Sequence, residues 1–452
     1  MISFRIGLIT LMAMYHLHVT NKKRVLMKKV LAVSVAALTL AACTKTVLWK
    51  SFIDNAELAT APLAIDTDAT SATWQLYPTD TGLSLRKLDA KGVTLWSAEV
   101  AGDVQAYTGK APELKTTSTG AVVAYNTGTG VFVKSFDANG SLLWMSDIGE
   151  HTSETVAAMV VGADDSVSLT IKTTGSKTNT LRLDTTGNVV WDKTMPTCTL
   201  IGAATCAPSL AINSDGLLVQ VNATLGNAAT YVIDSAGNTV WSKLRSTGVG
   251  TSGIKADPIT FTTNGIVVTN AFATWEYDMS GNQRWSVGFG GTAPVAVDAT
   301  GNLFVANGTK IKKLDANGVA LTKLDSEGVE VADEIDLDGQ LAISQLEWSE
   351  ADQRLIVLST YSNSTSVIIG KVTLNVGTSL WYFDATGKKI AKYASKPTVI
   401  TMDACAAVPN CPIDSTVYGD KWTQFSTTSN KMVVMTGNVE NESRYAVSYK
   451  LR

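Results

Sequence analysis

The sequence predicts an all-β fold assembled from repeated antiparallel hairpins. Three observations predict it. A turn motif of the form Asp-x-x-Gly-x-x-x-Trp recurs along the chain, short runs of alternating apolar and polar residues flank each turn, and the two chain ends resemble halves of one further repeat. Alternation with a period of two is the pattern of a half-buried strand, and a unit that recurs at a regular spacing is typical of repeat architectures.

The turn motif gives the period of the repeat. Successive turn aspartates are separated by 48, 47, 50, 44, 37 and 69 residues, and a period in the forties is typical of solenoids and propellers. Aspartate at the first position of a type I turn accepts hydrogen bonds from the turn backbone, and glycine at the fourth position adopts a positive φ. Each motif is therefore expected to close a hairpin. The turn aspartates are Asp89, Asp137, Asp184, Asp234, Asp278, Asp315 and Asp384.

A tryptophan follows the first five of these turns. After Asp315 and Asp384 the equivalent positions hold Thr322 and Ala391. The indole ring is a large apolar surface that can pack between neighbouring sheets, so we interpret the turn aspartates and these tryptophans as structural. The tryptophans are Trp96, Trp144, Trp191, Trp241 and Trp285.

A second hairpin precedes the first in most repeats, as in residues 209–222, 258–270 and 294–307. Two hairpins supply four antiparallel strands, and four such strands recurring at this period make one blade of a β-propeller. The sequence therefore predicts a propeller of four-stranded antiparallel blades.

The chain ends give the number of blades. Residues 444–452 resemble the strand that leads into a turn, and residues 46–52 resemble the strand that follows one. We expect the N- and C-terminal strands to share one blade and close the ring, which hides two sheet edges. Seven turns and one divided repeat predict an eight-bladed, single-domain propeller over residues 43–452. Residues 330–384 are expected to form an enlarged blade with an insertion; two blades there would make nine.

The N-terminal segment is typical of export. Residues 27–43 hold two lysines, an apolar run and small residues before Cys43, and resemble a bacterial lipoprotein signal. A plain signal peptide shares the charged and apolar regions, so Cys43 distinguishes the two. We expect cleavage before Cys43 and its acylation, palmitate included. The signal segment is then residues 1–42, with 27–42 as the signal peptide and 1–26 as a start-site artefact.

Four further cysteines form two close pairs, Cys198 with Cys206 and Cys405 with Cys411. In an oxidising compartment an even number of neighbouring cysteines is most simply two local disulfides. A metal site is the rival interpretation, but neither pair has a histidine nearby. Both pairs follow the strand after a turn, so we expect the two loops on the same face.

Catalytic and metal chemistry has little support in the residues after Cys43. His151 is the one histidine there, so a Ser-His-Asp triad would depend on it and a multi-histidine metal site is excluded. Residues 334–340 begin loosely like a calcium loop, but Gln345 stands where a bidentate glutamate is needed. Charged residues make up 17% of the chain without a basic block, which argues against nucleic acid. We expect no metal and no cofactor.

The tryptophan-ended turn, the cysteine of the export signal and the number of repeats resemble the quinoprotein-like (PQQ-type repeat) β-propeller family. Within it the chain distantly resembles the BamB lipoproteins of the outer-membrane β-barrel assembly machinery. The resemblance covers residues 46–452. Quinone-dependent enzymes of the family carry adjacent cysteines at the cofactor, whereas the closest cysteines here are Cys405 and Cys411.

The leading functional hypothesis is a non-catalytic scaffold that binds a protein partner in the bacterial cell envelope. Thr44 and Lys45 follow Cys43 without an aspartate, so we expect a lipid anchor in the outer membrane, with the propeller facing the periplasm or the cell surface. We expect a monomer. The alternative is an envelope or surface propeller that acts on polysaccharide or peptide as an enzyme, or binds it as a lectin.

Overall fold

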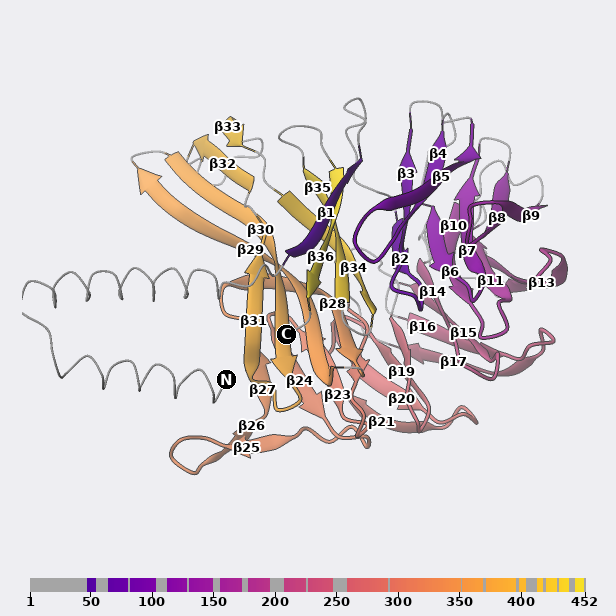
Figure 1. Ribbon diagram of the computed structural model, residues 1–452. Helices are drawn as coiled ribbons and strands as arrows, with labels where there is room; N and C mark the ends of the chain where they lie inside the picture. Colours follow the sequence, from indigo (N-terminus) through magenta and orange to yellow (C-terminus); the bar gives the residue numbers. More distant parts are fainter. Residues whose placement is uncertain are drawn as a thin grey trace, which may run out of the picture. The chain divides into compact units, whose positions relative to one another are not determined.

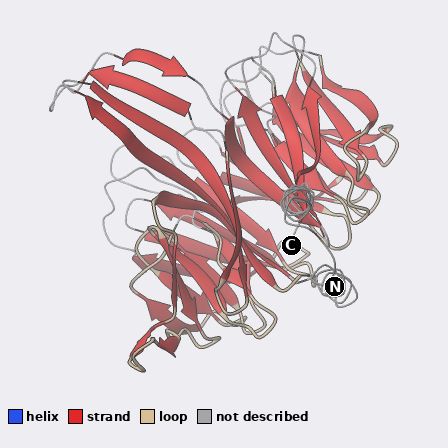
Figure 2. Ribbon diagram, turned by 60° about the vertical axis from the view of Figure 1, so that its left-hand side comes forward, coloured by secondary structure: helices blue, strands red, loops and turns tan. Residues whose placement is uncertain are grey.

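The computed structural model describes most of the chain after residue 46 (Figure 1). The described ranges are 47–53, 64–79, 82–102, 112–127, 130–148, 155–172, 178–195, 207–224, 227–246, 258–291, 293–350, 352–368, 371–395, 398–403, 413–417, 420–428, 431–438 and 444–450. Every element in these ranges is a β-strand (Figure 2).

Five four-stranded sheets follow one another along the chain, each with its strands in sequence order. Sheet I holds β2 (Ala64–Thr67), β3 (Thr73–Pro78), β4 (Leu83–Leu88) and β5 (Thr94–Ala101). Sheet II holds β6 (Glu113–Thr116), β7 (Gly120–Asn126), β8 (Val131–Asp137) and β9 (Leu142–Asp147). Sheet III holds β10 (Thr155–Val161), β11 (Val167–Lys172), β12 (Thr178–Leu183) and β13 (Val189–Met195). Sheet IV holds β14 (Ala207–Ile212), β15 (Leu218–Thr224), β16 (Asn227–Ile233) and β17 (Thr239–Ser246). Sheet V holds β18 (Ile259–Phe261), β19 (Ile266–Thr269), β20 (Thr274–Tyr277) and β21 (Gln283–Val287).

The remaining strands form three further sheets and one separate hairpin. Sheet VI holds β22 (Ala296–Val297), β23 (Leu303–Asn307), β24 (Lys310–Leu314) and β27 (Glu334–Asp336). The separate hairpin is β25 (Thr322–Leu324) with β26 (Glu330–Ala332). Sheet VII holds β28 (Gln340–Ser349), β29 (Arg354–Ile368), β30 (Lys371–Asp384), β31 (Lys389–Ala394), β32 (Thr398–Asp403) and β33 (Ile413–Val417). Sheet VIII has the order β1 (Val47–Ile53), β36 (Arg444–Lys450), β35 (Lys431–Asn438) and β34 (Asp420–Thr428).

The second and third strands of sheets I–V are largely buried, which explains their nearly continuous apolar runs. In β7, for example, every residue from Gly120 to Tyr125 is buried. The hydrophobic clusters join neighbouring sheets: Trp74 and Leu76 of sheet I pack with Val123 and Phe136 of sheet II. Burial on both faces removes the apolar/polar alternation that a sheet with one wet face shows.

Each predicted hairpin turn has the geometry that its aspartate and glycine favour. At Asp137, one carboxylate oxygen accepts hydrogen bonds from the backbone N–H groups of Asn139 and Ser141, both at 2.8 Å. The N–H of Gly140 donates to the carbonyl of Asp137 at 3.1 Å, and Gly140 has a φ of +87°. In the turn of sheet III, hydrogen bonds from Thr186 and Asn188 lower the pKa of Asp184 to about 2. The carboxylate is thus the form that holds the turn together.

The tryptophan of the fourth strand in each of sheets I–V lies on a turn of the next sheet. The indole N–H of Trp96 donates to the carbonyl of Ala138 at 2.9 Å, and a Cβ atom added to Gly140 would lie 2.7 Å from the Trp96 ring. The contact recurs along the chain. The further tryptophan–glycine pairs are Trp144 with Gly187, Trp191 with Gly237, Trp241 with Gly281, and Trp285 with Gly318. Glycine is therefore required by the packing of the tryptophan as well as by its φ.

The prediction of one enlarged blade over residues 330–384 needs a correction. In this segment β26 belongs to the separate hairpin, β27 to sheet VI, and β28, β29 and β30 to sheet VII. The hairpin of β25 and β26 is inserted between the third and fourth strands of sheet VI, so Thr322 lies in the insertion and not in the fourth strand. The cause is a second turn, in which the N–H of Gly328 donates to the carbonyl of Asp325. A second enlargement is the long pair β29 and β30, which continues to β32 and β33 (Figure 1).

Replacement of Gly140 by alanine should destabilise the fold more than the same change at Gly308. Both glycines have positive φ, so both variants carry backbone strain of roughly 1–3 kcal/mol. Only the Cβ at Gly140 also meets a side chain, whereas nothing lies within 4 Å of a Cβ at Gly308. Urea unfolding of the two variants measures the difference. Equal losses of stability would contradict the packing role of Trp96.

Candidate functional site

Exposed apolar side chains gather on the fourth strands of four consecutive sheets. Their exposure ranges from 51% for Leu143 to 75% for Leu244. We call this set the outer apolar band. It consists of Val93, Leu95, Leu142, Leu143, Met145, Val189, Val190, Val240 and Leu244, on or beside β5, β9, β13 and β17.

Strand geometry explains why Leu95, Val190 and Val240 face outward. Each tryptophan packs on the next sheet, and because neighbouring side chains of a strand point to opposite faces, the residue before it is directed away. That residue is Leu95 in β5 and Val190 in β13, whereas it is Arg284 in β21. A solvent-facing position of this kind normally holds a polar residue. The band is thus confined to sheets I–IV.

The strands that carry the band end consecutive sheets, and tryptophan contacts link these sheets. The Trp96 indole binds the turn that leads directly into β9, and Trp191 donates to the carbonyl of Ser235 in the turn before β17 at 3.1 Å. Each of these four strands also ends its sheet, so one backbone edge is unpaired within the sheet. Large apolar side chains that recur in exposed positions on edge strands of this kind are a candidate interaction surface.

A second candidate site is polar and lies where the strands β2, β6 and β34 of three sheets meet. Asp66 of β2 accepts hydrogen bonds from the N–H and the hydroxyl of Thr116 in β6, at 2.8 and 3.0 Å. Its other oxygen accepts from the hydroxyl of Ser426 in β34 at 3.3 Å. The Asp66 carboxylate therefore joins sheet I to sheets II and VIII.

Glu347 of β28 is the other carboxyl group at this junction. It accepts a hydrogen bond from the hydroxyl of Thr427 in β34. Burial raises the pKa of Glu347, and the negative charge of Asp66 raises it further. Nearby, Gln345 is bonded twice to Phe425: its amide donates to the Phe425 carbonyl at 3.1 Å and its oxygen accepts from the Phe425 N–H at 3.2 Å. Both oxygens of Asp66 accept hydrogen bonds from other strands, and Glu347 accepts one from β34. We therefore interpret Asp66 and Glu347 as residues that link neighbouring strands.

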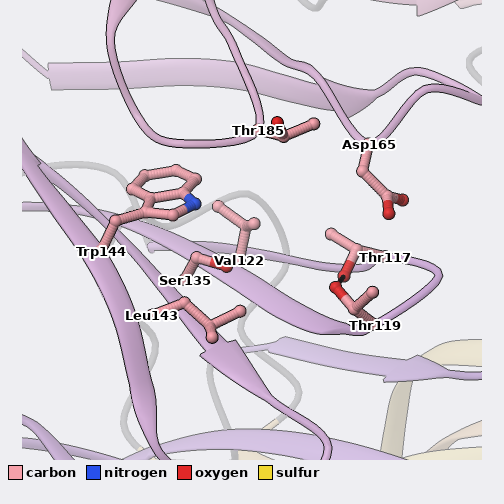
Figure 3. Close-up of a pocket in the computed structure, with 8 residues that line it drawn as sticks. All are labelled: Thr117, Thr119, Val122, Ser135, Leu143, Trp144, Asp165 and Thr185. Atoms are coloured by element: carbon pink, nitrogen blue, oxygen red, sulfur yellow. Dashed lines mark hydrogen bonds between the residues drawn. The ribbon is translucent and has the colours of Figure 1, made fainter.

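A cavity of about 280 Å³ lies between sheets II and III (Figure 3). Thr117, Thr119 and Asp165 line one part of it, and Val122, Ser135, Leu143 and Trp144 line another. Thr185 completes the lining. Asp165 accepts hydrogen bonds from the backbone N–H of Ser118 at 2.8 Å and from the Ser118 hydroxyl.

Several of the predicted site residues lie outside the described part of the chain. They are Cys43, the pairs Cys198 with Cys206 and Cys405 with Cys411, and His151. The lipidation and disulfide hypotheses therefore stay predictions. The seven turn aspartates and five tryptophans all lie in described hairpins, at the positions given above.

The segment considered for calcium is occupied by other contacts. Glu334 forms ion pairs with Lys310 at 3.1 Å and with Lys312 at 3.0 Å. Hydrogen bonds from Lys312 and then Lys310 lower the pKa of Glu334. Among the described residues, no three His, Cys, Asp or Glu side chains are close enough to hold a metal ion.

No helix in the described part of the chain is long and apolar enough to cross a membrane.

Sequence reasoning missed the junction and the cavity for different reasons. Asp66 and Glu347 lie far apart in the chain, and no motif marks either of them. The cavity could have been found, because Ser135 stands in the repeat where Lys87 and Arg182 stand in the flanking sheets. The outer apolar band was also visible as paired apolar residues before the tryptophan, such as Leu142 with Leu143.

No protein-family model matches the sequence, and no curated protein matches it. Its fold is similar to solved structures. The crystal structure of Sqt1 from Chaetomium thermophilum matches with a TM-score of 0.55 at 11% identity, covering 90% of this chain and 99% of that one. Virginiamycin B lyase from Staphylococcus aureus matches with a TM-score of 0.40 at 13% identity, over 68% and 95% of the two chains. Puromycin hydrolase matches with a TM-score of 0.41 at 11% identity, over 85% and 59%. These neighbours are β-propeller proteins, and the chain is a repeat protein with a β-propeller fold.

Replacement of Glu347 by glutamine should stabilise the protein increasingly as the pH rises. Because the pKa of Glu347 is raised on folding, its contribution to stability is present below the unfolded pKa of roughly 4.3 and is lost as the pH rises through the folded pKa. Glutamine stays neutral and can still accept from Thr427. Melting temperatures from pH 4 to 8 measure the effect, with exposed Glu327→Gln as control. A difference from the wild type that does not change with pH would contradict the assignment.

Proposed function

We propose that the chain is a lipid-anchored β-propeller that serves as a non-catalytic, protein-binding scaffold in the bacterial cell envelope. The observation that carries the proposal is the outer apolar band on sheets I–IV. An interface with a protein combines an apolar centre with a polar rim. The band has such a rim, since Glu99, Asp147 and Asp192 are exposed on the same strands.

The proposed scaffold is a closed ring of eight blades, in which β1 and β34–β36 form the blade shared by the two chain ends. Contacts between first strands support this arrangement: β2 lies against β6, β6 against β10, and β10 against β14. The hydroxyl of Thr260 in β18 donates to the carbonyl of Val295, next to β22, at 2.9 Å. On the other side, β34 is bonded to β28 through Gln345 and to β2 through Ser426. A closed ring leaves the fourth strands as the accessible edges.

The membrane anchor is part of the same proposal. Acylation of Cys43, palmitate included, would attach the propeller to the outer membrane, facing the periplasm or the cell surface. The lipoprotein signal and the resemblance to BamB support this location, and a role in outer-membrane protein assembly is consistent with both. An anchored scaffold would present its outer strands to membrane-associated partners without contributing catalytic groups.

The triple variant Leu95→Ser, Val190→Ser and Val240→Ser should lose its envelope partner while keeping its fold. Removing three apolar contacts from an interface lowers the affinity by more than tenfold, because each tenfold step is only about 1.4 kcal/mol. Affinity capture of the tagged full chain from gently solubilised envelopes, quantified by mass spectrometry, measures the partner. Melting temperature shows that the fold is kept.

A matched control places three serines at exposed apolar residues outside the band, namely Val319, Leu324 and Leu341. This control should retain the partner, and Cys43→Ala should release the protein from the membrane fraction. Equal recovery of the partner by wild type and by the band variant would overturn the scaffold proposal.

A further inference from the structure

One position of the repeat holds its smallest residue in sheet II. It lies two residues before the turn aspartate, on the third strand, and its side chain is directed between two sheets. Three of the seven residues at this position are long cations, and Ser135 is the smallest of the seven. The residues are Lys87, Ser135, Arg182, Val232, Glu276, Lys313 and Tyr382.

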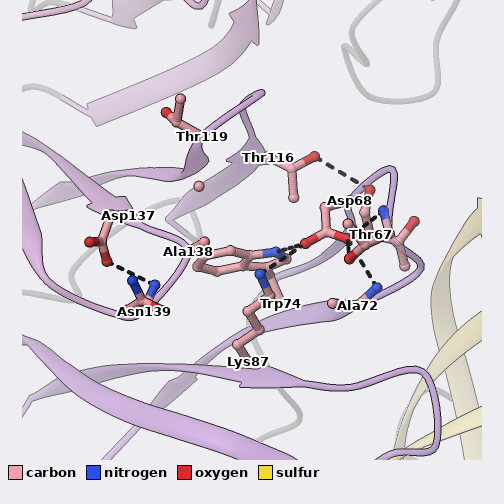
Figure 4. A network of polar contacts seen from close by, with 12 residues as sticks. Thr67, Asp68, Ala72, Trp74, Lys87, Thr116, Thr119, Asp137, Ala138 and Asn139 are labelled. Carbon is pink, nitrogen blue, oxygen red and sulfur yellow. Dashed lines mark hydrogen bonds and ion pairs between the residues drawn. The ribbon is translucent and has the colours of Figure 1, made fainter.

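In the flanking sheets the cation at this position reaches acidic and carbonyl oxygens of the turns. Lys87 lies 3.1 Å from the carboxylate of Asp68 and its Nζ lies 4.6 Å from the ring centre of Trp74 (Figure 4). Arg182 lies 3.0 Å from Asp164 and donates to the carbonyl of Gly216, in the first turn of the next sheet, at 3.0 Å.

Sheet VI shows the same arrangement with a lysine. Lys313 lies 2.8 Å from Asp333 and donates to the carbonyl of Thr386, in a turn of sheet VII, at 2.8 Å. Arg182 and Lys313 therefore each reach a turn of the next sheet, whereas the contacts of Lys87 lie within sheet I; each of the three cations is held by one carboxylate and by backbone or aromatic groups.

In sheet II the same location is the cavity of Figure 3. Ser135 is too short to fill it, and Asp165, from the first turn of sheet III, also lines it. Among the described residues no lysine or arginine is paired with Asp165. A carboxylate has about four acceptor sites and Ser118 uses two, so capacity for a further donor remains.

We propose that this cavity binds an alkylammonium or alkylguanidinium group of a ligand, in the place where sheets I, III and VI supply a cation of their own. The charged head would lie against Asp165 and the hydroxyls of Thr117 and Thr119. The aliphatic stem would pack on Val122 and Leu143. The Trp144 ring offers an aromatic face of the kind that attracts cations. The volume of about 280 Å³ is close to the lower end of the roughly 300–1,000 Å³ of small-molecule pockets.

The experiment is a titration of the full chain in mild detergent with butylguanidinium and with butylammonium. Binding is measured by isothermal titration calorimetry at fixed ionic strength. Both cations should bind saturably, and neutral 1-butanol should not. Ser135→Lys should abolish binding and raise the melting temperature, because it restores the internal cation of the repeat. Asp165→Asn should weaken binding at least tenfold, and asparagine tolerates the positive φ of 59° at this position.

The control Ser97→Lys adds the same charge at an exposed position of β5 and should bind both cations as the wild type does. Two further ligands separate the sources of the cation. Stronger binding of the peptide Gly-Arg-Gly than of butylguanidinium indicates a protein side chain, and stronger binding of putrescine than of butylammonium indicates a free amine.

Absence of cation binding to the wild type would overturn the proposal. Undiminished binding to Ser135→Lys or to Asp165→Asn would overturn it as well. These outcomes can be told apart from failure of the envelope scaffold. The cation site shares Leu143 with the outer apolar band but does not include Leu95, Val190 or Val240, and the titration needs neither the lipid anchor nor a protein partner.

Discussion

The packing of each fourth-strand tryptophan on the next turn is the contact on which the arrangement of sheets I–VI depends. It joins two residues that are each constrained for another reason: the glycine needs a positive φ, and the tryptophan must bury a large ring. The indole N–H adds direction where it meets a turn carbonyl, as at Met279, which accepts from Trp241 at 2.9 Å. The contact therefore fixes both the distance between neighbouring sheets and the face that each outer strand presents.

The outer apolar band is a consequence of the same contact. Once Trp191 is directed onto Gly237, strand geometry leaves Val190 facing outward whatever its polarity. Packing within the fold gives no reason for apolar residues there, and Gln283 and Arg284 show that the repeat accepts polar ones in β21. The proposed scaffold supplies a reason, since a partner that covers those strands would bury these residues.

Local chemistry made the hairpins predictable, and distance along the chain limited the rest. Asp137 and Gly140 specify their turn within a few residues, so the turn could be inferred from sequence. The hairpin at Asp325 carries the same turn chemistry without a tryptophan, and alternation alone does not show whether such a hairpin belongs to a sheet or is inserted into one. The junction of Asp66 with Glu347 brings together strands from opposite parts of the sequence, which no local pattern encodes.

In sheet VI, whose fourth strand has no tryptophan, other residues make the contact with the next turn. The position after Asp315 that would hold it has become part of the inserted hairpin, and the fourth strand is supplied later by β27. There Ile335 takes the place of the ring, since a Cβ added to Gly387 would lie 3.0 Å from the Ile335 side chain. Lys313 supplies the missing hydrogen bond to the turn by donating to the Thr386 carbonyl.

Phe304 and Trp348 also stack at the interface between sheets VI and VII, with ring centres 5.7 Å apart. Four residues, namely an aliphatic side chain, a cation and a buried ring pair, thus share what one indole does elsewhere. The requirement of the fold is accordingly a covered glycine and a satisfied turn carbonyl, and tryptophan is one way to meet both.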